Sequence, residues 1–309
     1  MEKFNHTVTE FILVGFTQDP VMQLVLFFLF LMVYSVTVVG NITLIVLICT
    51  DTRLHTPMYF FIGNLSFLDL WYSTVYTPKI MVNCVSEDKS ISFAGCVAQF
   101  LFSGGLAYSE CYLLAAMAYD RYMAISKPLL YAQVMTGGIC VGLVAASYLG
   151  AFVICGIFTH KTFTMTFCGD NVINHFFCDL PPLVKLACDV QANYHIFLYI
   201  ALTLNVLTPI VFILASYLFI ILAILRIRST QGQLKAFSTC SSHLISVTLY
   251  FGSLLYIYYR PSSSYSLQQD KIIALSYTVV FPMLNPMIYS LRNKDVKEAL
   301  KKLLKMSAS

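Results

Sequence analysis

The chain has 309 residues, of which 58% are hydrophobic and only 11% are charged, and its mean hydropathy is +0.75. Soluble globular domains carry about 25% charged residues, so this composition excludes an ordinary soluble protein and indicates a membrane protein. The formal net charge of +4 is read as an imbalance between the two sides of a membrane, and it does not indicate nucleic-acid binding.

Seven apolar runs follow one another along the chain, separated by short segments rich in charge, Pro or Gly. Each run reaches the roughly 20 residues that cross a bilayer as a helix, and long unbroken runs favour helices over the strands of a barrel. The predicted spans are 24–50, 57–82, 92–126, 139–160, 191–226, 235–260 and 270–291. The first run is too long for a cleavable leader, so it is expected to remain as the first span.

This pattern predicts an all-α seven-helix bundle over 24–291, between an extracellular segment, 1–23, and a cytoplasmic segment, 292–309. Twelve of the 19 Lys and Arg residues fall in loops on one side of such a bundle. The positive-inside tendency makes that side cytoplasmic and places the N-terminus outside.

The two end segments carry signals of their own. Asn5-His6-Thr7 is a glycosylation sequon, which is usable only if this end enters the secretory lumen. After Arg292 the sequence KDVKEALKKLLK places its apolar residues on one face of a short basic helix. We expect this helix to lie on the inner membrane surface, in contact with lipid.

Four cysteines fall at the outer face, which is an oxidising compartment. They are Cys96, Cys168, Cys178 and Cys188. Four cysteines allow three pairings, and spacing alone does not choose among them.

Two ionisable side chains lie deep inside predicted spans, Asp69 and Glu110. A buried carboxylate is costly unless it is paired, solvated or protonated. Asn41 and Asn285 could supply further oxygens at a similar depth, so we expect a small hard cation such as sodium, or a shared proton. The alternative is a neutral hydrogen-bonded cluster that only packs helices.

A charge pair, Asp120 and Arg121, ends the third run at the inner boundary, where a long basic side chain can snorkel. Such a pair is often only an interface anchor. In the seventh run, however, Pro286 interrupts the helical hydrogen bonds, Asn285 could repair the interruption, and Tyr289 is left near the inner face. Together these residues indicate a bundle with two arrangements.

Several strings then identify a family. They are "GN" at 40–41, "LHTPMYFFIGNLSFLDL" at 54–70, "MAYDRYMAI" at 117–125, "SY" at 216–217, "KAFSTCSSHL" at 235–244 and "PMLNPMIYSLRNKDV" at 282–296. With them the chain resembles an odorant (olfactory) receptor of the rhodopsin-like G-protein-coupled superfamily. The likeness covers the whole chain, and the long strings make chance agreement negligible.

The resemblance implies a switch at the inner face and a partner for it. Arg121 would be restrained at rest and would help to form the pocket for a stimulatory heterotrimeric G protein, which raises cAMP. The residues that the resemblance assigns to this switch are Asp120, Arg121, Tyr122, Tyr217, Lys235, His243, Asn285, Pro286 and Tyr289. It also implies the bridges Cys96–Cys178 and Cys168–Cys188, and the plasma membrane of olfactory sensory neuron cilia as the location.

By the same analogy, an odorant would bind among the third, fifth, sixth and seventh spans. The positions expected to line the pocket are Ser103, Gly104, Ala107, Tyr108, Cys111, Leu198, Leu202, Asn205, Phe251, Leu254, Leu255, Tyr258, Leu275 and Thr278. This largely apolar set favours a small, neutral volatile molecule with one or two hydrogen-bonding groups. Amine-binding relatives carry a carboxylate where Ser103 stands, which disfavours a protonated amine, although Asp179 lies near the expected lid.

The chain departs from the family pattern at two positions. Ser126 stands where the family usually has Cys, and the usual Phe-Tyr-Gly of the sixth span reads Tyr250-Phe251-Gly252. The second departure removes a hydroxyl from the expected pocket floor.

Other function classes are less well supported. The sequence has no P-loop, metal-ligand cluster or nucleophile elbow, so neither an enzyme nor a cofactor is expected, apart from an allosteric sodium ion. An ion-coupled transporter or channel that uses Asp69 and Glu110 would need inverted-repeat hydropathy, which is not seen. A chemosensory receptor of the same fold in another tissue remains an alternative.

Overall fold

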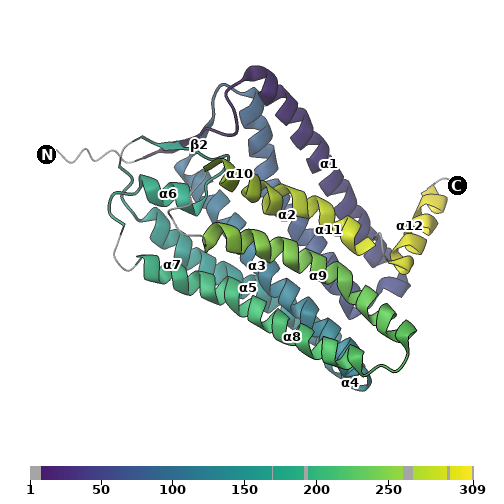
Figure 1. The fold of residues 1–309 in the computed structure, drawn as a ribbon. Coiled ribbons are helices and arrows are strands. Elements are labelled where there is room, and N and C mark those ends of the chain that lie inside the picture. Colours follow the sequence, from purple (N-terminus) through teal and green to yellow (C-terminus); the bar gives the residue numbers. More distant parts are fainter. Residues whose placement is uncertain (1–7, 169, 191–193, 260–266, 291–292, 308–309) are drawn as a thin grey trace.

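The computed structural model describes residues 8–168, 170–190, 194–259, 267–290 and 293–307. The helices form one elongated bundle, with the short outer elements β2 and α6 at one end and α4 and α12 at the other (Figure 1). The elements are β1 (Glu10–Leu13), α1 (Pro20–Thr50), η1 (Thr52–Leu54), α2 (Pro57–Val85), β2 (Ser90–Ser92), α3 (Phe93–Ser126), α4 (Pro128–Val134), α5 (Gly137–Phe163), β3 (Val172–Ile173), α6 (Leu180–Leu186), α7 (Tyr194–Leu202), η2 (Thr203–Leu207), α8 (Thr208–Leu225), α9 (Thr230–Tyr258), α10 (Leu267–Leu275), η4 (Ser276–Val280), α11 (Phe281–Ser290) and α12 (Lys294–Ser307).

The seven-helix prediction is confirmed. Within the described residues, six helical segments are long and apolar enough to cross a membrane. The seventh segment is α2, whose 29 residues include several polar side chains and which packs against both α1 and α3. The predicted spans differ from the observed helices by a few residues at their ends, where helices fray and caps decide the boundary.

Side-chain caps explain several of these boundaries. Asp19 accepts a hydrogen bond from the Val21 amide at 2.9 Å, directly before Pro20 in the first turn of α1. Ser92 and Ser229 accept from amides three residues later, at 3.1 Å each, and begin α3 and α9. These side chains satisfy amide groups that a helix N-terminus leaves without a partner.

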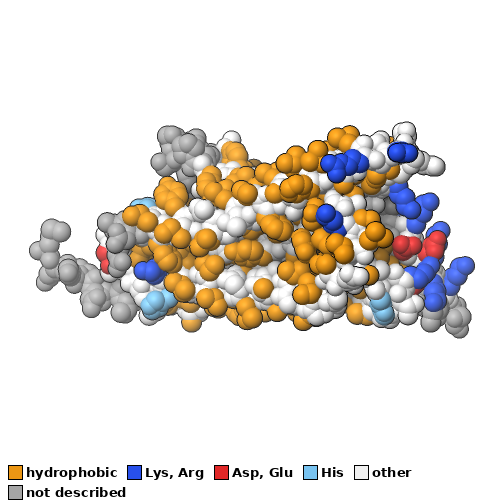
Figure 2. All heavy atoms as spheres, turned by 90° about the horizontal axis from the view of Figure 1, so that it is seen from below, with side chains coloured by type: hydrophobic (Ala, Val, Ile, Leu, Met, Phe, Trp, Pro, Cys, Tyr) orange, Lys and Arg blue, Asp and Glu red, His pale blue; other side chains and the backbone are white. Residues whose placement is uncertain are grey.

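The surface agrees with a membrane position. Figure 2 shows hydrophobic side chains along the length of the bundle, with Lys and Arg gathered at the end that carries α12. That end is the cytoplasmic one predicted from the basic loops, and the basic helix expected there is α12. Its residues Val296 and Ala299 are buried, and its Glu298 pairs with Arg53 of η1 at 2.7 Å.

Three features were not anticipated from the sequence. The fifth and seventh spans each contain a π-helical turn, η2 and η4, so neither is one regular helix. Short helices, α4 and α6, form in loops. In addition, β1 pairs antiparallel with β2 and parallel with β3, which makes a small sheet from the N-terminal segment and two outer loops.

The small sheet anchors the N-terminal segment on the outer end of the bundle. Phe11 and Leu13 of β1 are fully buried, in a cluster that includes Cys96 and Cys178. The Lys271 ammonium group donates to the Gly15 carbonyl at 2.6 Å, which links this segment to α10. Asn5, the predicted glycosylation site, lies outside the described residues.

Candidate ligand and coupling sites

A buried cavity of about 50 Å³ lies beneath the long outer loop, in the outer half of the bundle. It is enclosed by α2, α3, α5, η2, α9, η4 and the segment around α6. Its lining consists of Tyr72, Tyr76, Phe100, Ser103, Gly104, Ala107, Tyr108, Cys155, Phe158, Phe177, Asp179, Leu180, Val206, Leu254, Tyr258 and Tyr277. Aromatic rings dominate this wall, and the polar atoms come mainly from tyrosine hydroxyls.

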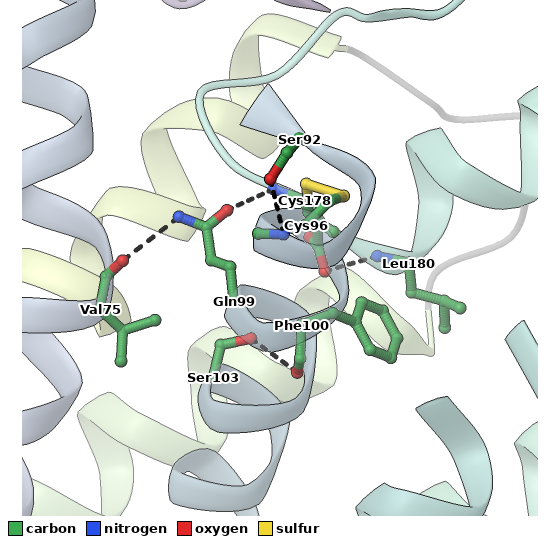
Figure 3. The surroundings of a disulfide bond; sticks show 10 residues. Val75, Ser92, Cys96, Gln99, Phe100, Ser103, Cys178 and Leu180 are labelled. Atoms are coloured by element: carbon green, nitrogen blue, oxygen red, sulfur yellow. Dashed lines mark hydrogen bonds between the residues drawn. A yellow bond between two sulfur atoms is a disulfide. The ribbon is translucent and has the colours of Figure 1, made fainter. Parts of the chain in front are cut away.

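A disulfide and one amide side chain hold the roof of this cavity in place (Figure 3). Cys96 of α3 is bonded to Cys178 of the loop, with an S–S distance of 2.02 Å and a Cα–Cα distance of 5.6 Å. Gln99 accepts from the Cys178 amide at 2.9 Å and donates to the Val75 carbonyl of α2 at 3.2 Å. The loop is therefore fixed to two helices at the point where Phe177 and Asp179 face the cavity. The second expected bridge, Cys168–Cys188, is also present.

Asp179 is the acidic residue of the cavity wall and is only 8% exposed. Its Oδ1 accepts from the Leu180 amide at 2.8 Å and from the Tyr258 hydroxyl at 3.4 Å. Burial raises the pKa of Asp179 from 3.8 to about 6, although these two hydrogen bonds oppose the increase. The carboxylate is still mainly ionised at neutral pH.

Six of the predicted pocket residues line the cavity: Ser103, Gly104, Ala107, Tyr108, Leu254 and Tyr258. The other eight do not line it: Cys111, Leu198, Leu202, Asn205, Phe251, Leu255, Leu275 and Thr278. Among these, the Asn205 amide donates to the Ala201 carbonyl, and the Thr278 hydroxyl donates to the Ala274 carbonyl. The cavity thus lies closer to α2 and the outer loop than sequence reasoning placed it.

Sequence reasoning missed the contribution of α2. Tyr72 and Tyr76 are one helical turn apart, are almost fully buried, and both line the cavity. Tyrosines at i and i+4 share a helix face, so this spacing was a usable signal. The position of Asp179 next to the bridged Cys178 was a second signal, because the bridge draws the loop over the bundle.

The two deep carboxylates are brought together with one of their predicted partners. Asp69 and Glu110 are at most 2% exposed. The Asn285 amide donates to Asp69 Oδ2 at 3.0 Å, and Asn285 Oδ1 accepts from Ser246 at 3.3 Å. Among the described residues, Asp69 Oδ1 and Asn41 Oδ1 are buried without a hydrogen-bond partner.

The expected repair of the seventh helix by Asn285 is wrong, because its side chain is occupied by Asp69 and Ser246. Pro286 has no amide hydrogen, so the Pro282 carbonyl four residues earlier lacks its helical donor. Asn41 of α1 supplies that donor, with its amide nitrogen 2.9 Å from the Pro282 oxygen. The repair therefore comes from another helix and ties α1 to α11.

A larger cavity of about 570 Å³ opens at the cytoplasmic end. Its lining includes five residues that the sequence assigned to coupling: Asp120, Arg121, Lys235, His243 and Tyr289. Arg121 donates from Nε to Asp120 Oδ2 at 3.1 Å, and the Tyr131 hydroxyl of α4 donates to Asp120 Oδ1 at 2.7 Å. With Arg121 only 7% exposed, the guanidinium group is held against its neighbour.

His243 connects three helices beside this cavity. Its Nε2 lies 2.9 Å from the Leu114 carbonyl of α3, and its Nδ1 lies 2.7 Å from the Tyr217 hydroxyl of α8. Because a carbonyl oxygen only accepts, Nε2 carries the proton in the neutral ring, and Nδ1 accepts from Tyr217. Four other residues predicted for the switch do not line the cavity: Tyr122, Tyr217, Asn285 and Pro286.

Known proteins are similar to this chain over nearly its whole length. The family model described as olfactory receptor matches residues 30–307. Olfactory receptor 9G19 of Mus musculus is 70% identical over 305 residues, which are 99% of this chain and 100% of that protein. Olfactory receptor 9G1 of Homo sapiens is 71% identical over 304 residues, which are 98% and 100% of the two chains. The chain belongs to the olfactory receptor family.

The fold of this olfactory receptor is that of a rhodopsin-like receptor. The crystal structure of squid rhodopsin superposes with a TM-score of 0.73 and covers 94% of this chain and 87% of that one, at 16% identity. As a member of the olfactory receptor family, the chain is a multi-pass plasma membrane receptor of the G-protein-coupled class, and it is not an enzyme.

The two departures from the family pattern have visible consequences in this receptor. Tyr250 is 1% exposed, and its hydroxyl donates to the Ala107 carbonyl of α3 at 2.8 Å. Phe251 does not line the outer cavity, so the hydroxyl that it lacks is not missing from the lining of that cavity. Ser126 Oγ is buried and has no hydrogen-bond partner in the described part of the chain.

Proposed function

We propose that this receptor binds a small volatile organic molecule in the outer cavity and activates a stimulatory heterotrimeric G protein through the inner cavity, raising cAMP. Tyrosine hydroxyls and Ser103 among apolar rings suit a ligand with one or two hydrogen-bonding groups. We place the receptor in the cilia of olfactory sensory neurons, with expression in another tissue as the alternative.

The observation that carries this proposal is that α3 belongs to both cavities. Ser103, Gly104, Ala107 and Tyr108 of α3 line the outer cavity, and Asp120 and Arg121 of the same helix line the inner one. α9 does the same through Leu254 and His243. A ligand that shifts α9 relative to α3 therefore acts on the bond between His243 and Leu114, and on the room available to Arg121.

Arg121→Ala tests the coupling half of the proposal. We expect loss of ligand-evoked cAMP with surface expression close to wild type, because the side chain touches the inner cavity and does not hold the helices together. The measurement is a cAMP reporter in cells exposed to diverse volatiles, with Arg228→Ala as a matched control from an exposed loop. A full response from the Arg121 variant would contradict the proposed switch.

We further propose that the Asp69 and Glu110 carboxyl groups hold a sodium ion or share a proton. In the described part of the chain, Asp69 Oδ1 and Asn41 Oδ1 are buried without a donor, and they are acceptors that a small cation would satisfy. Asn285 would hold the Asp69 carboxylate in place through the bond at 3.0 Å. A bound cation would offset the charge of two acids buried close to each other.

Asp69→Asn and Glu110→Gln test this second proposal. Both variants are expected to change basal cAMP and to remove its dependence on external sodium, because each deletes one negative charge with almost no change of shape. Asp88→Asn, in an exposed loop, is the control. Unchanged basal activity and sodium response in both variants would instead support a cluster that only packs helices.

A further inference from the structure

The outer cavity combines an aromatic wall with one buried charge. Eight of its lining side chains are aromatic: Tyr72, Tyr76, Phe100, Tyr108, Phe158, Phe177, Tyr258 and Tyr277. Asp179 is the single charged residue among the described lining residues, and none of them is Lys, Arg or His. The wall therefore carries net negative charge and presents ring systems around a small space.

Both features attract the same chemical group. The faces of Tyr and Phe rings carry partial negative charge and bind ammonium groups, most strongly where water is excluded. A buried carboxylate without a cationic partner is costly. Among the residues that the structure describes, Asp179 forms no ion pair, and the two hydrogen bonds to its Oδ1 do not neutralise it. An organic cation in the cavity would meet the rings and the carboxylate together.

The size of the cavity limits that cation. A volume of about 50 Å³ is far below the roughly 300 Å³ at which drug-sized sites begin. Only a compact group of a few heavy atoms fits without expansion, which describes a small alkylammonium ion.

A second cavity shares one wall residue with the first. It has a volume of about 290 Å³ and also has Asp179 in its wall. Asp270 of α10 lies in the same wall, and so do His175 and Lys185. Because Asp179 belongs to both cavities, its carboxylate can attract an ammonium ion in either of them.

We infer that small ammonium ions are the preferred ligands of the outer cavity, with Asp179 as their counter-ion and the tyrosine rings as their cage. The signalling consequence rests on the proposed receptor function, but the binding does not. The carboxylate that amine-binding relatives place at the position of Ser103 is supplied here from the roof of the cavity.

This assignment has a pH dependence of defined sign. Burial raises the pKa of Asp179 to about 6, so the carboxylate loses its charge as pH falls through that value. Among the described residues, the titratable groups close to it are Tyr76, Tyr108, Tyr258, Tyr277 and Asp270, and His175 and Lys185 share a cavity wall with it. Burial lowers the pKa of His175 to about 3, so this ring stays neutral over the range of interest. Ammonium binding should therefore weaken below about pH 6.

The probe for the test is tetramethylammonium, whose charge does not change with pH, and the neutral comparison is tert-butanol, which has the same number of heavy atoms. Binding of each to purified receptor in lipid nanodiscs is measured by ligand-observed NMR, for wild type, Asp179→Asn and Asp170→Asn. Asp170 is an exposed carboxylate of the same loop and serves as the matched control. Tyr258→Leu and Tyr258→Phe test the ring separately from the hydroxyl.

We expect tetramethylammonium to bind wild type at least about tenfold more tightly than tert-butanol at neutral pH. Asp179→Asn should lose that preference while still binding tert-butanol, and Asp170→Asn should keep it. Below pH 6 wild-type affinity for the cation should fall about tenfold per pH unit, because ionised Asp179 falls by that factor, whereas the Asn variant should not respond. Tyr258→Phe should retain most of the binding that Tyr258→Leu loses.

Equal binding of the two probes by wild type, or an unchanged preference in Asp179→Asn, would overturn the inference. Loss of the preference in Asp270→Asn but not in Asp179→Asn would also overturn it and would place the cation in the outer vestibule. A parallel cAMP assay separates the two proposals. Asp179-dependent binding with no cAMP response to any volatile counts against the proposed coupling alone, whereas cAMP responses to neutral odorants without cation preference count against this inference alone.

Discussion

Single side chains supply hydrogen bonds that the backbone of a helix lacks. Pro286 removes one donor from the seventh span, and Asn41 of the first span supplies it to the Pro282 carbonyl. Asn285 is thereby left to bond Asp69 and Ser246 at the centre of the bundle. At this scale, sequence indicates which residue types lie in the membrane, but the partner of each depends on a helix far away in the chain.

Tyr250 offers a direct test at the residue scale. Tyr250→Phe keeps the ring and deletes only the bond of 2.8 Å to the Ala107 carbonyl, which joins α9 to α3. We expect a loss of about 0.5–1.5 kcal/mol of stability, the usual contribution of one buried hydrogen bond, and a rise in basal cAMP because α9 is held less firmly. Thermal unfolding of the purified receptor and a cAMP reporter measure the two effects.

The control for that variant is Tyr199→Phe, at a tyrosine on α7 that is 61% exposed. If Tyr250→Phe melts at the wild-type temperature and leaves basal cAMP unchanged, the bond does not restrain α9.

At the element scale, the outer cap is assembled from pieces that have little structure by themselves. β1 is only four residues long, β3 only two, and α6 only seven. They persist because the Cys96–Cys178 bridge, the pairing of β1 with two loops, and the burial of Phe11 and Leu13 hold them together. Hydrophobic periodicity does not reveal such elements, because each is shorter than the window of about 11–18 residues over which a period can be recognised.

In the cap, the ionisation of Asp179 makes the stability of the folded receptor depend on pH. Burial raises the pKa of Asp179 from 3.8 to about 6, because the folded state favours the neutral carboxyl group. The stabilisation relative to the ionised form is therefore fully present below pH 3.8 and is lost as pH rises through about 6. That difference corresponds to about 3 kcal/mol. In the absence of ligand, Asp179→Asn should therefore be more stable than wild type near neutral pH, by up to that amount.

Thermal unfolding of both proteins between about pH 3.5 and 7.5 checks this expectation. The advantage of the Asn variant should shrink as pH falls and vanish below about pH 4, where wild-type Asp179 is neutral as well. A variant that is less stable than wild type at every pH would show that the carboxylate is offset by contacts other than the two described bonds.

At the scale of the whole molecule, the bundle places an aromatic cavity outside, two buried acids in the middle, and a wide cavity with a charge pair inside. α3 contributes to each of these sites, through Tyr108, Glu110 and Arg121. Opposite ends of one rigid element are suited to linking binding with coupling, because a displacement at one end is carried to the other. The basic inner end, visible in Figure 2, fixes which cavity faces the cytoplasm.

The sequence by itself determined the membrane class, the seven spans, their orientation, the two disulfide pairs implied by resemblance, and the inner charge pair. Hydrophobic length, the side on which charges fall and distinctive strings are properties of local sequence, so each can be read without coordinates. The walls of the outer cavity were decided only by tertiary structure. Tyr76 and Asp179 meet there because a disulfide draws a loop onto α3 and Gln99 fastens it to α2. The repair at Pro286 was likewise decided by packing, because two residues 241 positions apart form the bond that completes it.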